Sequence, residues 1–284
     1  MTCIYVEMSR CYAAHHMFGE ASRILNQCLA LQPHCSAALI ALASLEARQH
    51  RPGSAEKFLE QALSCDFGIR SVTLFRLVNS IIKAQQDKVD DSLTEVEELI
   101  ALPEVRSNNP FDAAGLSDGG IGSSYKSSTG HVSTGGPTDM LRLTNDDRVG
   151  AFIVYATLLS KLRRLKEANK VLGEAKIIFS GLVQETQVLV ASSQLAVERK
   201  DYDSAIRMLS KIEEGSSSYA KAQVLKANIL LRHNRDKEGY CKCFTDLVEL
   251  DPCAKNYILL GDAYLKILNP EGAVDAFEMA YAKE

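Results

Sequence analysis

The stretch YILLGDAY, residues 257–264, is followed by Ala273, Phe277 and Ala280 near the C-terminus. Apolar residues three, four and seven positions apart share one face of a helix, so both parts of this stretch predict amphipathic helices. The small residues Gly261 and Ala273 predict that the two helices approach closely and that these two positions face each other. Larger side chains between them are then expected to fill the remaining space. The stretch therefore predicts one tightly packed helical hairpin.

The same pattern returns along the chain with a period of about 34 residues. Ala21 and Ala55, the anchors of the first two hairpins, lie 34 positions apart, and the anchors of the last four follow at spacings of 37, 35 and 33. Loops of different length explain this drift, so we count seven hairpins. The third is a degenerate copy, with Ser92, Val96 and Leu99 in its second-helix positions.

A 34-residue repeat of paired helices with small residues at these positions is typical of the tetratricopeptide repeat (TPR). We therefore expect an all-α fold, a TPR superhelix or α-solenoid, in which each hairpin packs on its neighbours. The expected organisation is hairpins 1–3 over residues 1–106, a flexible insert over residues 107–140, and hairpins 4–7 over residues 141–284. The insert is rich in Gly and Ser and has too few apolar groups to offset the entropy of ordering it.

Composition and charge exclude several classes of protein. The net charge is −4, and no basic stripe with interleaved aromatic residues is present, which argues against nucleic-acid binding. No apolar run approaches about 18 residues, so we expect no membrane insertion. Residues 1–20 already belong to the first repeat and do not resemble a signal peptide. The sequence therefore predicts a soluble, intracellular protein.

The ends of the chain fall inside the repeat pattern. The sequence starts within a first helix and stops at the close of a second helix, without an additional polar capping helix. Solenoids normally carry polar caps, because an uncapped end leaves an apolar face in water. We therefore expect a fragment of a longer array; the alternative is a complete small protein that associates end to end.

Motifs that suggest chemistry fail on inspection. The run GGIGSS, residues 119–124, is similar to a phosphate-binding loop but lacks the Gly-Lys-Ser/Thr ending and a preceding strand. The eight cysteines form no C-x-x-C pair, and Cys28 stands where the repeat needs a small buried residue, so we expect free thiols packed as small hydrophobes. We nominate no catalytic, cofactor-binding or metal-ligating residue, and we expect no enzyme, no cofactor and no small-molecule substrate.

A short motif within the expected insert, Asn109-Pro110-Phe111, resembles the tripeptides that EH domains bind in flexible segments. The alternative is an ordinary turn after a helix. At the far end of the insert, Asn145-Asp146-Asp147 is expected to cap the helix that follows.

The inner positions of the first helices predict an apolar groove. They carry Val6, Ile40, Ile153, Val190 and Ile258 in the better repeats. TPR domains that bind chaperones carry Lys, Asn and Arg there instead, to hold a terminal carboxylate. A small apolar groove suits a helix or a neighbouring subunit laid along it, so we predict that these five residues bind a partner. The alternative is that some of them only support neighbouring first helices.

The segment LLRHNRDK, residues 230–237, continues to Tyr240 and Cys243-Phe244 and is not part of the general repeat consensus. Together with residues 257–264 and Asn269-Pro270-Glu271, it resembles the tetratricopeptide repeat protein 21 family, the large TPR subunit of intraflagellar transport complex A. The resemblance covers essentially the whole chain and is most specific over residues 150–284. The family protein is several times longer than this chain.

The resemblance implies a non-catalytic scaffold of a ciliary particle that supports retrograde transport and cargo entry into the cilium. It implies that the partners are other large repeat subunits, and that the protein resides in the cytoplasm and in the cilium or flagellum and its base. Two alternatives stay open. One is a cytosolic TPR co-chaperone or adaptor that binds peptide termini, and the other is the TPR part of a longer transferase.

Overall fold

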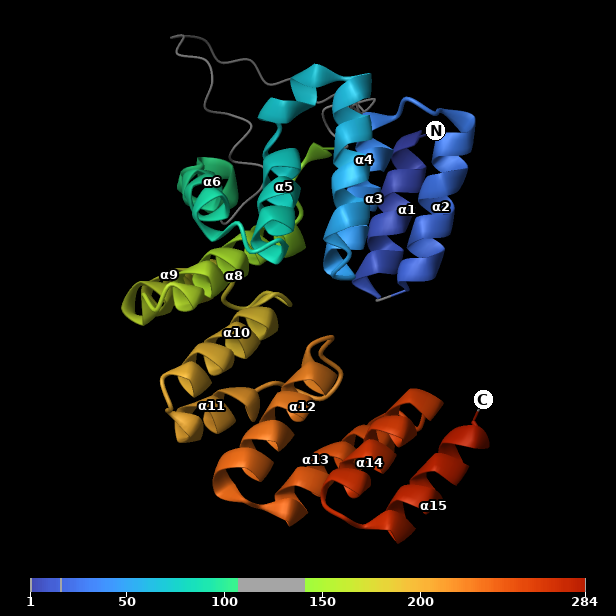
Figure 1. The fold of residues 1–284 in the computed structure, drawn as a ribbon, viewed down its shortest axis with the longest axis vertical. Coiled ribbons are helices and arrows are strands. Elements are labelled where there is room, and N and C mark those ends of the chain that lie inside the picture. Colours follow the sequence, from blue (N-terminus) through green and yellow to red (C-terminus); the bar gives the residue numbers. More distant parts are fainter. Residues whose placement is uncertain (1, 16, 107–140, 284) are drawn as a thin grey trace, which may run out of the picture. The chain divides into compact units, whose positions relative to one another are not determined.

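In a computed structural model, residues 2–15, 17–106 and 141–283 are described, and they fold into α-helices joined by short turns (Figure 1). These residues form consecutive helical hairpins, so the expected all-α TPR array is confirmed. The chain divides into two compact units, Met1–Glu167 and Ala168–Glu284. The predicted insert 107–140, with its Asn109-Pro110-Phe111 motif, lies outside the described residues. The predicted boundaries of the three segments stay predictions.

The first unit contains three helix pairs, a short helix after the third pair, and one long helix. Their bounds are α1 Thr2–Ala14, α2 Phe18–Leu31, α3 Ser36–Arg48, α4 Pro52–Cys65, α5 Thr73–Gln85, α6 Val89–Ala101, α7 Pro103–Arg106 and α8 Asn145–Lys161. A 3₁₀ turn, η1 (Phe67–Ser71), joins α4 to α5.

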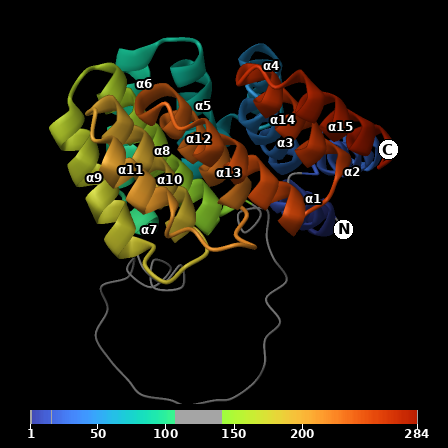
Figure 2. The same cartoon turned by 90° about the horizontal axis from the view of Figure 1, so that it is seen from below.

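The second unit contains most of α9 and three further helix pairs, of which α14 and α15 lie side by side in Figure 2. The bounds are α9 Leu165–Ile178, α10 Glu185–Glu198, α11 Tyr202–Leu209, α12 Tyr219–Ile229, α13 Lys237–Leu250, α14 Ala254–Lys266 and α15 Pro270–Tyr281.

Within the first unit, the first helices also contact one another. Helix α1 packs on α3, α3 on α5, and α5 on α8, so these four helices form a continuous layer, which we call the first-helix row. The second helices pack on this row through small residues. Ala21 and Cys28 on α2, and Ala55 and Ala62 on α4, are fully buried. The small positions read from the sequence are thus the positions where the helices approach most closely.

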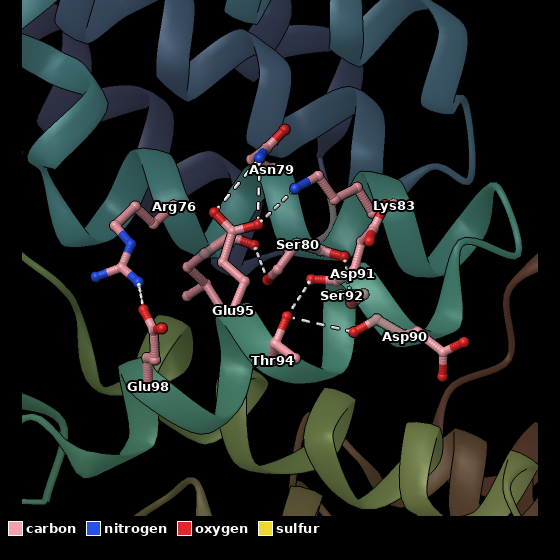
Figure 3. A network of polar contacts seen from close by, with 11 residues as sticks. Arg76, Asn79, Ser80, Lys83, Asp90, Asp91, Ser92, Thr94, Glu95 and Glu98 are labelled. Carbon is pink, nitrogen blue, oxygen red and sulfur yellow. Dashed lines mark hydrogen bonds and ion pairs between the residues drawn. The ribbon is translucent and has the colours of Figure 1, made fainter.

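In the degenerate third hairpin, a network of polar contacts joins α5 and α6 in addition to their buried apolar residues (Figure 3). Ser92 occupies the small-residue position, is fully buried, and donates a hydrogen bond to the carbonyl of Ser80 at 2.8 Å. Glu95 accepts a hydrogen bond from Lys83 at 2.9 Å and lies within 3.4 Å of the Asn79 amide. Because these polar groups satisfy one another, the hairpin closes without the usual alanine.

The segment LLRHNRDK forms the turn between α12 and α13. Residues Leu230–Asn234, labelled η4, make a π-helical turn, which widens the end of α12 by one residue. His233 in this turn stacks on Tyr202 at the start of α11, with ring centroids 3.6 Å apart. The segment that deviates from the repeat consensus therefore builds an unusual turn that links two hairpins.

A left-handed residue follows the first helix in six of the hairpins. In each case a backbone N–H after it returns to a carbonyl of the preceding helix, as Asn269 N does to Tyr264 O at 2.9 Å. Glycine is the usual residue here because it has no Cβ to clash. None of these six is glycine; they are His50, Asp87, Arg163, Lys200, Arg235 and Leu268, with φ between 54° and 65°.

We expect the substitution Leu268→Gly to stabilise the protein. Leu268 is 87% exposed and has φ of 65°, so its side chain contributes little packing while the backbone conformation costs about 1–2 kcal/mol. The free energy of unfolding, measured by chemical denaturation, should rise by about 1 kcal/mol. The matched change Leu265→Gly, inside α14, should lower it by a similar amount. A loss of stability from Leu268→Gly would contradict this account of the turn.

The last hairpin packs differently from the expectation that Gly261 faces Ala273. A Cβ added at Gly261 would meet Cε1 of Phe277 at 2.5 Å, and all three of its nearest heavy atoms belong to that ring. Ala273 is buried, at 1% exposure, and both positions lie in the hairpin core. The nearest side chain to Gly261 is thus an aromatic ring one turn further along α15 than Ala273, which fills the space that the glycine leaves.

We predict opposite effects for two alanine substitutions of helical glycines. Gly261→Ala should lower the free energy of unfolding by about 1–3 kcal/mol, because the new methyl group overlaps the Phe277 ring. Gly173→Ala, in α9, should raise it by about 0.5–1 kcal/mol, since no atom lies within 4 Å of the added Cβ. Denaturation of both variants beside the parent chain checks this, and an equal gain from both would rule out the contact with Phe277.

Candidate partner-binding surface

The first-helix row carries a pocket of about 270 Å³. Residues of α1, α2 and α3 line it, together with Leu74 of α5 and residues at the start of α8. Its floor includes small apolar side chains such as Ala37 and Ala41, and charged side chains stand at its edge. A hollow of this size, lined by several helices, is a place where a side chain of a bound segment fits.

The charges around the pocket occur as ion pairs. Arg10 lies 2.9 Å from Glu7 within α1, and Arg48 of α3 lies 3.2 Å from Asp147 of α8. Arg48 is 38% exposed at its side chain, whereas Asp147 is only 11% exposed. With Asp146, the lining carries three carboxylates against two guanidinium groups, unlike the cationic groove that a terminal carboxylate requires.

Asp147 connects the start of α8 to the first-helix row. Thr144 is the N-cap of α8, and its hydroxyl accepts a hydrogen bond from the backbone N–H of Asp147 at 3.1 Å. The Asp147 carboxylate accepts from the backbone N–H of Thr144 at 3.0 Å and also pairs with Arg48. The cap expected at Asn145–Asp147 is therefore centred one residue earlier, in a reciprocal capping box.

We expect Asp147→Ala to lower the free energy of unfolding by about 1–2 kcal/mol, because it removes one half of the capping box and the partner of Arg48. The matched control is Asp91→Ala. Asp91 holds the same third position in α6, where the N-cap residue, Lys88, makes no side-chain capping bond. Its loss should cost less than about 0.5 kcal/mol. Denaturation curves that move equally for both variants would contradict a special role for Asp147.

The structure places the five predicted groove residues in different surroundings. Val6 and Ile40 are fully buried and Val190 is 3% exposed, so none of them offers surface to a partner. Their side chains pack into the cores of their units, which corresponds to the alternative that such residues support neighbouring helices. Ile153 is half-buried and Ile258 is 44% exposed. Partner binding stays a prediction, and it now rests on these last two.

Sequence reasoning missed Arg10 and Arg48 beside the pocket, and it named Asp147 only as part of a helix cap, without its ion pair to Arg48. The pattern of apolar positions does not reveal them, because they are ordinary charged residues on helix surfaces. One local signal was available: Thr144 and Asp147 have the spacing of a capping box, which marks the start of a helix.

The cysteines, all of which are described, carry free thiols. Cys28 is fully buried, and its burial, with a smaller contribution from Cys35, raises its pKa to about 11. Cys28 is therefore protonated at neutral pH and acts as a small hydrophobe in the α2 position that needs one. Among residues 2–15, 17–106 and 141–283, no three His, Cys, Asp or Glu side chains gather as a metal site, and no helix is long and apolar enough to cross a membrane.

The family model described as the ARM repeat of tetratricopeptide repeat protein 21 matches residues 67–247, more than half of the chain. The chain belongs to the tetratricopeptide repeat protein 21 family. The matched range includes the degenerate third hairpin and the π-helical turn, and it confirms the resemblance read from the sequence.

Members of the tetratricopeptide repeat protein 21 family align along nearly the whole chain. Tetratricopeptide repeat protein 21B of Homo sapiens is 28% identical over 90% of the chain, and protein 21A of the same species is 25% identical over 92%. The homolog of Caenorhabditis elegans is 22% identical over 80%. The chain spans 18% of the length of either human relative.

Solved structures share the fold. A crystal structure of the APC/C hetero-tetramer Cut9–Hcn1 superposes with a TM-score of 0.56 at 10% identity, covering 99% of this chain and 46% of that one. A tetratricopeptide repeat protein from Parabacteroides merdae gives a TM-score of 0.51 at 14% identity, covering 98% of this chain and 91% of that one. At such identities the likeness concerns the arrangement of helices alone.

Proposed function

We propose that this chain is a non-catalytic scaffold segment that binds other large repeat subunits within intraflagellar transport complex A. In this role it serves retrograde ciliary transport and cargo entry, and it resides in the cytoplasm and in the cilium or its base. The observation that carries the proposal is the family match over residues 67–247. The proposed partners are proteins, and the proposed role includes no nucleic acid and no small-molecule substrate.

Exposed apolar side chains on the last hairpin support a role in binding protein. Ile258 and Leu265 are 44% and 51% exposed on α14, and Val274 is 55% exposed on α15. Leucine, isoleucine and valine side chains left in water cost free energy that a partner recovers by covering them. We therefore propose that this face of the hairpin, which includes the predicted groove residue Ile258, packs on another repeat subunit or on further repeats of a longer array.

Affinity purification from ciliated cells tests the proposal. We expect subunits of complex A to dominate the proteins recovered with the tagged chain. The double substitution Ile258→Glu/Leu265→Glu should reduce their recovery roughly tenfold, because charged groups replace apolar contacts at one surface. Lys255→Glu, an exposed change on the same helix, should leave recovery nearly unchanged.

A different set of recovered proteins would contradict the proposed function. If heat-shock chaperones dominate the recovered proteins, and a synthetic acidic C-terminal peptide competes for their binding, the chain is a co-chaperone adaptor. Recovery of complex-A subunits that is insensitive to the α14 substitutions would instead keep the function and move the binding surface elsewhere.

A further inference from the structure

Residues 141–144 lie against hairpins that are distant from them in sequence. They precede α8, and Leu141 packs against two buried clusters, one around Val6 and Leu42 and one around Ile40 and Val78. Leu143 packs against the second of these clusters. Arg142, between the two leucines, is exposed. Leu141 lies in a 3₁₀ turn and residues 142–144 have no regular secondary structure, and both leucines are more buried than Arg142 between them.

Polar contacts fix the same stretch to the first-helix row. The carbonyl oxygen of Arg142 accepts a hydrogen bond from the Arg10 guanidinium at 3.4 Å, across 132 positions of sequence. Six residues after Leu141, Asp147 pairs with Arg48 at 3.2 Å. The segment that makes these contacts with α1 and α3 belongs, in sequence, to the start of the fourth hairpin.

This arrangement has the features of a bound ligand that is covalently attached to its receptor. Two leucines contact apolar clusters and a main-chain carbonyl accepts a hydrogen bond from an arginine, while the Asp147 carboxylate, just beyond the segment in α8, pairs with a second arginine. The pocket of about 270 Å³ lies beside it, lined by Thr144 and Asp147 together with α1, α3 and α5. A helical hairpin does not need this segment for its own closure, since α8 already packs on α5 and α6.

We propose that residues 141–144 act as a built-in ligand that closes the surface of hairpins 1–3, and that their release opens this surface to an extended apolar segment of a partner protein. The segment that fits has two apolar residues separated by one exposed residue, as in Leu-Arg-Leu. The proposal adds a binding mode to the proposed scaffold function. It rests on that function only in assuming that the partner segment comes from another subunit. A peptide probe therefore tests it independently of ciliary complexes.

The test uses a fluorescein-labelled octapeptide with the sequence of residues 137–144, PTDMLRLT, and fluorescence polarisation. A tethered segment competes at an effective concentration on the order of 1 mM, so a peptide of about 100 µM affinity binds the intact chain roughly tenfold more weakly than an open surface. We expect the variant Leu141→Ser/Leu143→Ser to bind the peptide about tenfold more tightly than the intact chain.

Two control variants locate the effect. Arg142→Lys changes the exposed side chain of the same segment but keeps its positive charge, and it should bind like the intact chain. Ala41→Arg, placed in the double-serine background, projects a long side chain into the pocket and should abolish binding. Equal peptide binding by the intact and double-serine chains, or binding that Ala41→Arg does not change, would overturn the proposal.

A second variant and a second measurement apply if the double variant does not fold. If circular dichroism shows reduced helicity, Leu143→Ser alone replaces it, with the same direction of change expected. In the intact chain, an excess of the peptide PTDMLSLT, in which serine replaces the arginine so that trypsin does not cleave the probe, should accelerate trypsin cleavage after Arg142, because displacement frees the backbone of the segment. Cleavage at an unchanged rate at saturating peptide would show that the segment is not displaceable and would overturn the inference. Loss of the complex-A partners alone would bear on the proposed function and leave this result intact.

Discussion

Close approach of paired helices at small residues is the constraint on which the rest of the structure depends. Ala21, Ala55 and Ala205 are each fully buried at the same position of a second helix. A larger side chain there would hold the helices apart and leave apolar surface in contact with water. With the helix pairs closed, the apolar side chains of the first helices pack in the layer between hairpins. That is why so many of them are covered by their own chain.

Sequence reasoning recovered what depends on local periodicity and missed what depends on distant contacts. The spacing of alanines located the helices and the buried slots, including Ser92 in the degenerate hairpin. Periodicity does not state which first-helix residues face a neighbouring helix, so Val6, Ile40 and Val190 were assigned to a groove although they are buried. The turns were equally hidden, because the left-handed positions carry ordinary residues such as His50 and Leu268 where glycine would have signalled them.

The polar interface of the third hairpin shows how a degenerate repeat keeps its place in the array. Buried polar groups contribute little net stability, but leaving one unpaired is costly. Shifting α6 along α5 would separate Glu95 from Lys83 and Ser92 from the Ser80 carbonyl together. The network thus penalises alternative registers in a hairpin where a serine replaces the alanine used elsewhere.

The contacts of Arg10 and Arg48 with residues 142 and 147 have a mechanical consequence. In a repeat array each hairpin touches only its neighbours, so a pulling force detaches hairpins one after another from an end. Here the first hairpin is tied to the start of the fourth through Arg10, and the second through Arg48. Load applied between these points is shared by several bonds in parallel. These two contacts therefore make the first hairpins harder to detach from the N-terminal end than in an array held by neighbour contacts alone.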